Sequence, residues 1–182
     1  GDKEAVDTLL TDERIKAVSF VGSTPIAEYI YSTASAHGKR CQALGGAKNH
    51  AIVMPDADMD NAVAQLLGAA FGSSGKRCMA LSVAVAVGDA AADLLVSKMA
   101  EAMKTLKIGP CHDANNDFGP VITKQHQQKV FGYIDSAENQ GATIVVDGRN
   151  PSVTGHENGF YVGGTLIDQV TPEMESYDAE IF

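Results

Sequence analysis

The sequence predicts an α/β fold with a mainly parallel sheet and flanking helices. Short apolar stretches of strand length alternate with amphipathic stretches of helix length, and glycine-rich turns separate them. The 182 residues are 45% hydrophobic, so the chain has enough apolar surface for a core and room for one domain or for pieces of two. Gly1 stands directly before a helix and Phe182 ends the chain without a polar tail, so we expect a piece of a longer protein.

The first elements resemble half of a β–α–β unit. Pro25 at the first position of a helix, with Ser23 and Thr24 before it as caps, is a well-formed helix start. In order, we expect a helix over 3–11, a buried strand over 17–21, a glycine turn and a helix over 26–35.

The rest of the chain continues the alternation of strands and helices. Carboxylates at positions 56, 58 and 60 suit the start of a helix, whose apolar stripe ends at Gly72. The run 82–87 is apolar throughout and suits burial on both faces of a parallel sheet. Beyond it we expect a helix over 90–107, a polar loop to 120, a helix from Thr123 to 140, strands over 142–146 and within 160–170, and a loop over 171–182.

Charge and cysteine content exclude several classes of function. A formal net charge of −9 argues against a nucleic-acid or anionic-membrane surface. Three irregularly spaced cysteines with no CxxC pair indicate neither a disulfide framework nor a zinc site, and they favour a reducing compartment, the cytoplasm. No apolar run approaches the roughly 18 residues of a membrane span, and no signal-peptide core is present.

Cys78 is the strongest candidate for chemistry. It follows two cations, Lys76 and Arg77, in a loop hinged by Gly72 and Gly75. Neighbouring cations lower the pKa of a cysteine thiol and so activate it as a nucleophile. The alternative is a structural thiol buried near a turn.

Other candidates have simpler explanations. The turn at Gly22 and Ser23 could bind an anion at a helix N-terminus, or be an ordinary capped junction. The turn at Gly45 could bring backbone against a planar ligand, or be only a sharp bend. Cys111-His112-Asp113 is interpreted as a solvated loop rather than a metal site, Cys41 as inert, and the carboxylates at 56, 58 and 60 as helix caps and surface.

Together these strings resemble the aldehyde dehydrogenase superfamily, in order and spacing, over essentially the whole chain. Two of them, 46–50 and 77–82, are similar to its CoA-acylating methylmalonate-semialdehyde dehydrogenase branch. The strings are Phe20-Val21-Gly22-Ser23-Thr24, Leu44-Gly45-Gly46-Ala47-Lys48-Asn49-His50, Pro55-Asp56-Ala57-Asp58, Gly75-Lys76-Arg77-Cys78 and Glu180-Ile181-Phe182.

The resemblance implies that residues 1–41 are the C-terminal part of a Rossmann-like, NAD-binding domain and that 42–182 are a truncated catalytic domain. It makes Cys78 the nucleophile. The implied cofactor-binding residues are Gly22 and Ser23 by the pyrophosphate, Gly45 at the nicotinamide end, Glu180 on the nicotinamide ribose and Phe182 near the ring.

One departure from the superfamily pattern concerns Leu44. Hydrolytic members carry a glutamate four residues before the lysine that matches Lys48, and it serves as base for the deacylating water. Leu44 has no carboxylate, and Ala43 supplies none. Water is then a poor acceptor for the acyl group, so a thiol such as CoA is expected to take it.

The resemblance therefore implies oxidation of methylmalonate or malonate semialdehyde, with NAD as cofactor and CoA as co-substrate, to propionyl-CoA or acetyl-CoA through a thioester on Cys78. Arg77 would bind the substrate carboxylate. Two alternatives stay open: a non-acylating NAD(P)-dependent aldehyde dehydrogenase with a relocated base, and an inactive fragment of such an enzyme. Superfamily members form dimers or tetramers, so by analogy a homo-oligomer is expected of the full-length protein.

Overall fold

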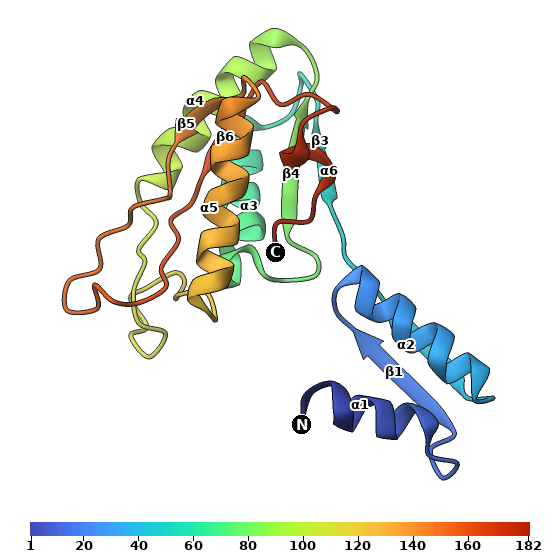
Figure 1. Cartoon of the computed structure of the whole chain (residues 1–182). Helices are drawn as coiled ribbons and strands as arrows, with labels where there is room; N and C mark the ends of the chain where they lie inside the picture. The colour runs from blue at the N-terminus through green and yellow to red at the C-terminus, as the bar shows by residue number, and fades with distance from the viewer. The chain divides into compact units, whose positions relative to one another are not determined.

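A computed structural model describes every residue of the chain, 1–182, and the chain divides into two compact units. The first unit is Gly1–Ala47 and the second is Lys48–Phe182. Each unit has its own strands (Figure 1). Each also has its own apolar core. The division lies after Ala47, whereas the sequence analysis placed a domain boundary after residue 41.

The first unit is a β–α–β arrangement with one additional helix before it. Its strands pair in parallel, from Ala17 opposite Arg40 to Val21 opposite Leu44. The elements are α1 (Asp2–Thr11), β1 (Ala17–Val21), α2 (Thr24–Ala36) and β2 (Arg40–Leu44). The strand β2 was not predicted, although its polar and apolar residues alternate from Arg40 to Ala43 as in a short half-buried strand.

Apolar side chains from both helices and both strands form the core of the first unit. Leu10 of α1 and Ile30 of α2 are almost fully buried, and Phe20 of β1 and Cys41 of β2 pack against them. The Lys39 ammonium donates to the carbonyls of Asp12 and Ile15 and so ties the end of α2 to the loop before β1. Cys41, which the sequence analysis interpreted as inert, thus packs against this core.

The second unit begins with a parallel β–α–β arrangement. Helices α3 and α4 pack on one face of the β3–β4 pair through Val63, Leu66, Leu95 and Met99. The elements are β3 (Asn49–Val53), α3 (Met59–Phe71), a 3₁₀ turn η1 (Gly72–Gly75), β4 (Leu81–Ala86) and α4 (Asp89–Met103).

The opposite face of this strand pair is uncovered. Ile52 and Val85, which are register partners, are 70% and 42% exposed. The prediction that the strand beginning near Ser82 is buried on both faces is therefore wrong for the chain as it stands. Leu81 and Ala86, at the two ends of β4, pack against the helix core, whereas Ser82, Ala84 and Val85 are exposed.

The remaining elements form a third layer, with β5 and β6 between α4 and α5. Val146 and Leu166 pack against the apolar core that α3 and α4 form together. Ile144 packs with Val130 and Ile134 of α5. The β5–β6 pair is antiparallel, unlike the other two pairs, and this agrees with a mainly parallel fold. The elements are α5 (Lys124–Asn139), β5 (Thr143–Val146), β6 (Leu166–Asp168) and α6 (Glu175–Asp178), the last within a segment predicted as loop.

The Asp58 side chain caps α3, since its Oδ1 accepts the Asn61 N–H at 3.1 Å. We expect Asp58→Ala to lower the free energy of unfolding by about 1 kcal/mol, because the first turn of the helix loses a partner. Urea denaturation followed by circular dichroism measures the change. Asp56→Ala is the matched control, since Asp56 is an exposed carboxylate that caps nothing. Equal losses in both variants would contradict the capping role.

Candidate active site

The three cofactor-binding candidates of the first unit lie at one edge of its sheet. Gly22 follows β1 and Gly45 follows β2, and the Gly22 N–H donates to the Leu44 carbonyl at 3.1 Å. A Cβ at residue 45 would lie 2.8 Å from the Thr24 hydroxyl oxygen. Only glycine therefore lets the backbone come this close to the start of α2. Ser23 is the N-cap residue of α2, and its side chain makes no capping hydrogen bond.

This edge has the features of a phosphate site. The carboxyl ends of parallel strands are where open α/β sheets bind ligands. A helix N-terminus there adds N–H groups and the positive end of the helix dipole. The structure therefore brings Gly22, Ser23 and Gly45 to the same edge, and their role in cofactor binding stays a prediction.

Cys78 lies in the second unit, after a loop with unusual backbone geometry. Ser73, Ser74 and Gly75 all have left-handed φ values, 55°, 56° and 72°. For the two serines such a conformation costs on the order of 1 kcal/mol each. The buried Ser74 hydroxyl donates to the Gly119 carbonyl at 2.8 Å, and this bond helps to hold the strained loop.

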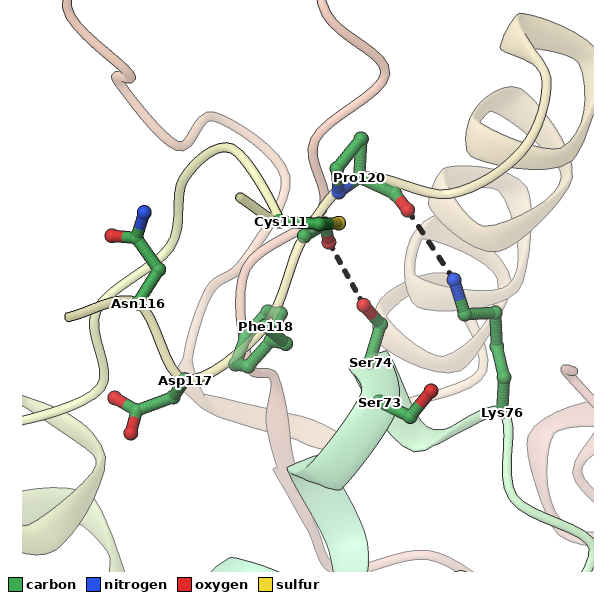
Figure 2. Close-up of a pocket in the computed structure, with 9 residues that line it drawn as sticks. Ser73, Ser74, Lys76, Cys111, Asn116, Asp117, Phe118 and Pro120 are labelled. Atoms are coloured by element: carbon green, nitrogen blue, oxygen red, sulfur yellow. Dashed lines mark hydrogen bonds between the residues drawn. The ribbon is translucent and has the colours of Figure 1, made fainter. Parts of the chain in front are cut away.

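A second contact joins the same two loops. The Lys76 ammonium donates to the Pro120 carbonyl at 3.3 Å (Figure 2). Ser74 and Lys76, which precede Arg77 and Cys78, thus both bind backbone carbonyls of residues 119 and 120. Lys76 has a structural role in the loop, for which the sequence offered no reason.

The thiol itself is open to solvent. Cys78 is the second residue of a turn that the Ala80 N–H closes by donating to the Arg77 carbonyl at 3.0 Å. Cys78 is exposed and carries no disulfide, and the next residue, Met79, is 78% exposed. The alternative of a buried structural thiol is therefore wrong.

Arg77 folds back from the turn toward the end of α3. A Cβ at residue 72 would lie 2.6 Å from a guanidinium nitrogen of Arg77, so the guanidinium covers the Gly72 backbone. Arg77 forms no ion pair with a carboxylate of the chain. Its planar donor array thus remains available for an external carboxylate.

Lys48 holds the segment that carries Glu180. Its ammonium donates to the carbonyls of Ser176 and Ala179, both at 2.8 Å. Burial lowers the pKa of Lys48 below its ordinary value, and the charges of Asp178 and Glu180 oppose that change. The lysine thus fixes the backbone immediately before Glu180.

Phe182 packs beside the loop that leads to Cys78. A Cβ at residue 75 would be 3.8 Å from its ring, and the His126 ring of α5 lies with its centroid 5.3 Å from that of Phe182. Phe182 also joins the apolar cluster of Val121 and Val130. The structure therefore brings Phe182 to the loop of the proposed nucleophile.

A separate hollow lies on the side of this loop that faces residues 116–120 (Figure 2). It has a volume of about 230 Å³ and is lined by Ser74, Lys76, Cys111 and Asp117 among others, but not by Cys78. Cys111 is exposed, and no group of three or more His, Cys, Asp or Glu side chains is placed to hold a metal ion.

No helix has the length and apolar character needed to cross a bilayer.

The chain belongs to the aldehyde dehydrogenase family, whose sequence profile matches residues 1–182. It is 62% identical to malonate-semialdehyde dehydrogenase from Pseudomonas aeruginosa and 51% identical to malonate-semialdehyde dehydrogenase 1 from Bacillus licheniformis. Both matches cover 100% of the chain and 37% of the relative, so the chain spans just over a third of the length of these curated relatives.

Solved structures agree with this membership. The crystal structure of methylmalonate-semialdehyde dehydrogenase from Oceanimonas doudoroffii is 82% identical with a TM-score of 0.97, and the match covers 100% of this chain and 37% of that one. Betaine aldehyde dehydrogenase from Staphylococcus aureus in complex with NAD+ is 28% identical with a TM-score of 0.90, over 96% of this chain and 35% of that one. The predicted α/β fold and the resemblance to the superfamily are confirmed.

Sequence reasoning did not assign the residues that hold the candidate site in place. Lys48 and Asn49 were noted only as part of a string, and Ser74 only as part of a loop. Their partners are backbone carbonyls far along the chain, in residues 78–80, 119 and 176–179. Carbonyl positions follow from the fold, so no sequence pattern predicts these contacts.

The Lys48 contacts predict an effect on the mobility of the C-terminal segment. We expect Lys48→Met to increase hydrogen exchange at the amides of Tyr177 and Ala179, because both anchoring bonds to the segment are lost. Exchange followed by mass spectrometry, resolved to residues 174–182, measures the effect. Lys124→Met, at the exposed start of α5, is the control and should leave this segment unchanged. Unaltered exchange in Lys48→Met would contradict the anchoring role.

Proposed function

We propose that the protein oxidises malonate or methylmalonate semialdehyde with NAD and transfers the acyl group to CoA. The observation that carries the proposal is the exposed Cys78 thiol on a braced turn next to an unpaired guanidinium. The relatives named malonate- and methylmalonate-semialdehyde dehydrogenase support it through the names they carry.

The first unit would hold NAD. The edge formed by Gly22, Ser23 and Gly45 suits a pyrophosphate, and the backbone at Gly45 suits close approach of a planar group. A Sinorhizobium meliloti protein provisionally given the methylmalonate-semialdehyde dehydrogenase name is 55% identical, and its crystal structure contains NAD. When bound, NAD accepts a hydride from the substrate carbon. Glu180 and Phe182 are the further residues proposed to bind the cofactor. The proposal makes 1–41 part of the cofactor domain and 42–182 part of the catalytic domain.

Cys78 would act as the nucleophile. Its thiolate attacks the aldehyde carbon, and loss of hydride from that carbon leaves a thioester on the sulfur. The carboxylate of the semialdehyde, which Arg77 would bind as a fork, leaves as CO2, and the α-carbon takes up a proton in its place. The thiol of CoA then displaces Cys78 and carries the acyl group away as propionyl-CoA or acetyl-CoA.

The choice of CoA over water would follow from Leu44, the last residue of β2. A hydrolytic enzyme needs a carboxylate base at this position, and an aliphatic side chain cannot take a proton from water. All three cysteines are unpaired, which suits the reducing cytoplasm. By analogy with the family, the active form would be a dimer or tetramer.

Cys78→Ala tests the nucleophile in the active enzyme. We expect turnover to fall by about 10⁴-fold or more, because no other group can form the thioester. NADH formation at 340 nm measures the rate. Cys111→Ala is the control, since Cys111 is also an exposed thiol but lines the separate hollow, and its rate should match the parent. Retention of the parental rate in Cys78→Ala would refute the proposed chemistry.

Leu44→Glu tests the role of the missing base. We expect this variant to release more free acid relative to acyl-CoA, because a carboxylate at residue 44 can activate water. Product analysis with and without CoA measures the ratio. Leu44→Gln keeps the shape but not the basicity and should leave the ratio unchanged. A parent that already forms free acid at the same rate without CoA would instead indicate a non-acylating enzyme with its base elsewhere.

A further inference from the structure

Asn49, the first residue of β3, contacts the turn that carries Cys78. Its side-chain amide nitrogen donates to the Cys78 carbonyl and to the Ala80 carbonyl, both at 2.9 Å. An amide nitrogen has two hydrogens, so these two bonds use its full donor capacity. Both acceptors are carbonyl oxygens, which only the nitrogen side of the amide can satisfy.

The turn has little else to hold it. Arg77 and Cys78 are exposed and Met79 is 78% exposed, so only Ala80, at its end, is buried. The contacts from Ser74 and Lys76 fix the chain before the turn, not the turn itself. Asn49 supplies the only side-chain hydrogen bonds to residues 77–80.

We propose that Asn49 is a positioning residue for the Cys78 nucleophile, an inference that rests on the proposed function. The two bonds fix the peptide planes that follow Cys78 and Ala80. The plane that includes the Cys78 carbonyl sets the direction in which the Cys78 side chain leaves the backbone. Asn49 therefore determines where the sulfur lies relative to a bound aldehyde, although it touches neither sulfur nor substrate.

The position of Asn49 explains how an exposed turn is given a fixed geometry. Its backbone lies at the start of β3, where it is register partner to Leu81 of β4, just beyond the turn. The adjacent residue, Lys48, holds the Glu180 segment in the same way, through two carbonyls. One short stretch of backbone thus fixes both the nucleophile turn and the segment proposed to bind the nicotinamide ribose.

Two variants of the active enzyme test the proposal, Asn49→Ala and Asn49→Asp. The aspartate has the same shape but can donate neither bond, and it places a negative charge near the turn that carries the thiol. We expect the NADH burst rate per titrated Cys78 thiol to fall by about 10- to 100-fold in both variants, because the sulfur is misplaced. In Asn49→Asp the midpoint of the pH profile for iodoacetamide alkylation of Cys78 should also rise, because a nearby anion disfavours the thiolate. The KM for NAD should stay at the parental value.

Asn139→Ala, which truncates an exposed asparagine at the end of α5, is the matched control and should behave as the parent. A merely structural role for Asn49 would reduce the number of titratable active sites while each remaining site kept the parental burst rate and pH profile. That result would overturn the proposal, as would parental behaviour in both Asn49 variants. The Cys78→Ala variant tests the proposed function separately, because turnover that persists in that variant would refute the function whatever the Asn49 variants show.

Discussion

Burial cannot hold the proposed nucleophile Cys78 in place, because its thiol is open to solvent, and the contacts around it follow from this constraint. The thiol and its neighbour Met79 are exposed, so apolar packing contributes little to the position of the turn. Polar side chains take over this role. Asn49 binds the turn itself, and Ser74 and Lys76 bind residues 119 and 120 from the chain before it. Each contact ends on a backbone carbonyl, so each fixes main chain rather than another mobile side chain.

The same means of attachment recurs at the C-terminal segment. Lys48 is taken partly out of water, which lowers its pKa, and the charges of Asp178 and Glu180 offset only part of that effect. A partly buried ammonium is costly unless it is hydrogen-bonded, and the two carbonyls supply such bonds. In the first unit, by contrast, the corresponding positions are set by close backbone approach: residue 45 lies against Thr24, and Gly22 bonds to the end of the neighbouring strand. Glycine suffices there because strands and helix already fix the geometry.

The elements with strong periodicity could be predicted from the sequence, and those defined by long-range partners could not. The helix that Asp58 begins and Gly72 ends was found because caps and an apolar stripe coincide. The strand β2 and the short helix α6 were not, since β2 exists through pairing with β1, and the contacts of α6 are with α5 and with Lys48. The candidate site divides in the same way. Cys78 stood out by its loop and neighbouring cations, whereas Asn49 is ordinary in sequence and acquires its role only when the fold places two carbonyls beside it.

The uncovered face of the β3–β4 pair has a consequence for how the chain behaves in water. Ile52 and Val85 stand side by side on it, and Met54 beyond them is half exposed. Adjacent aliphatic side chains on a flat, open sheet favour contact with another such surface, and unpaired strand edges add a template for intermolecular hydrogen bonding. Solubility at high concentration therefore depends on whether this surface finds a cover.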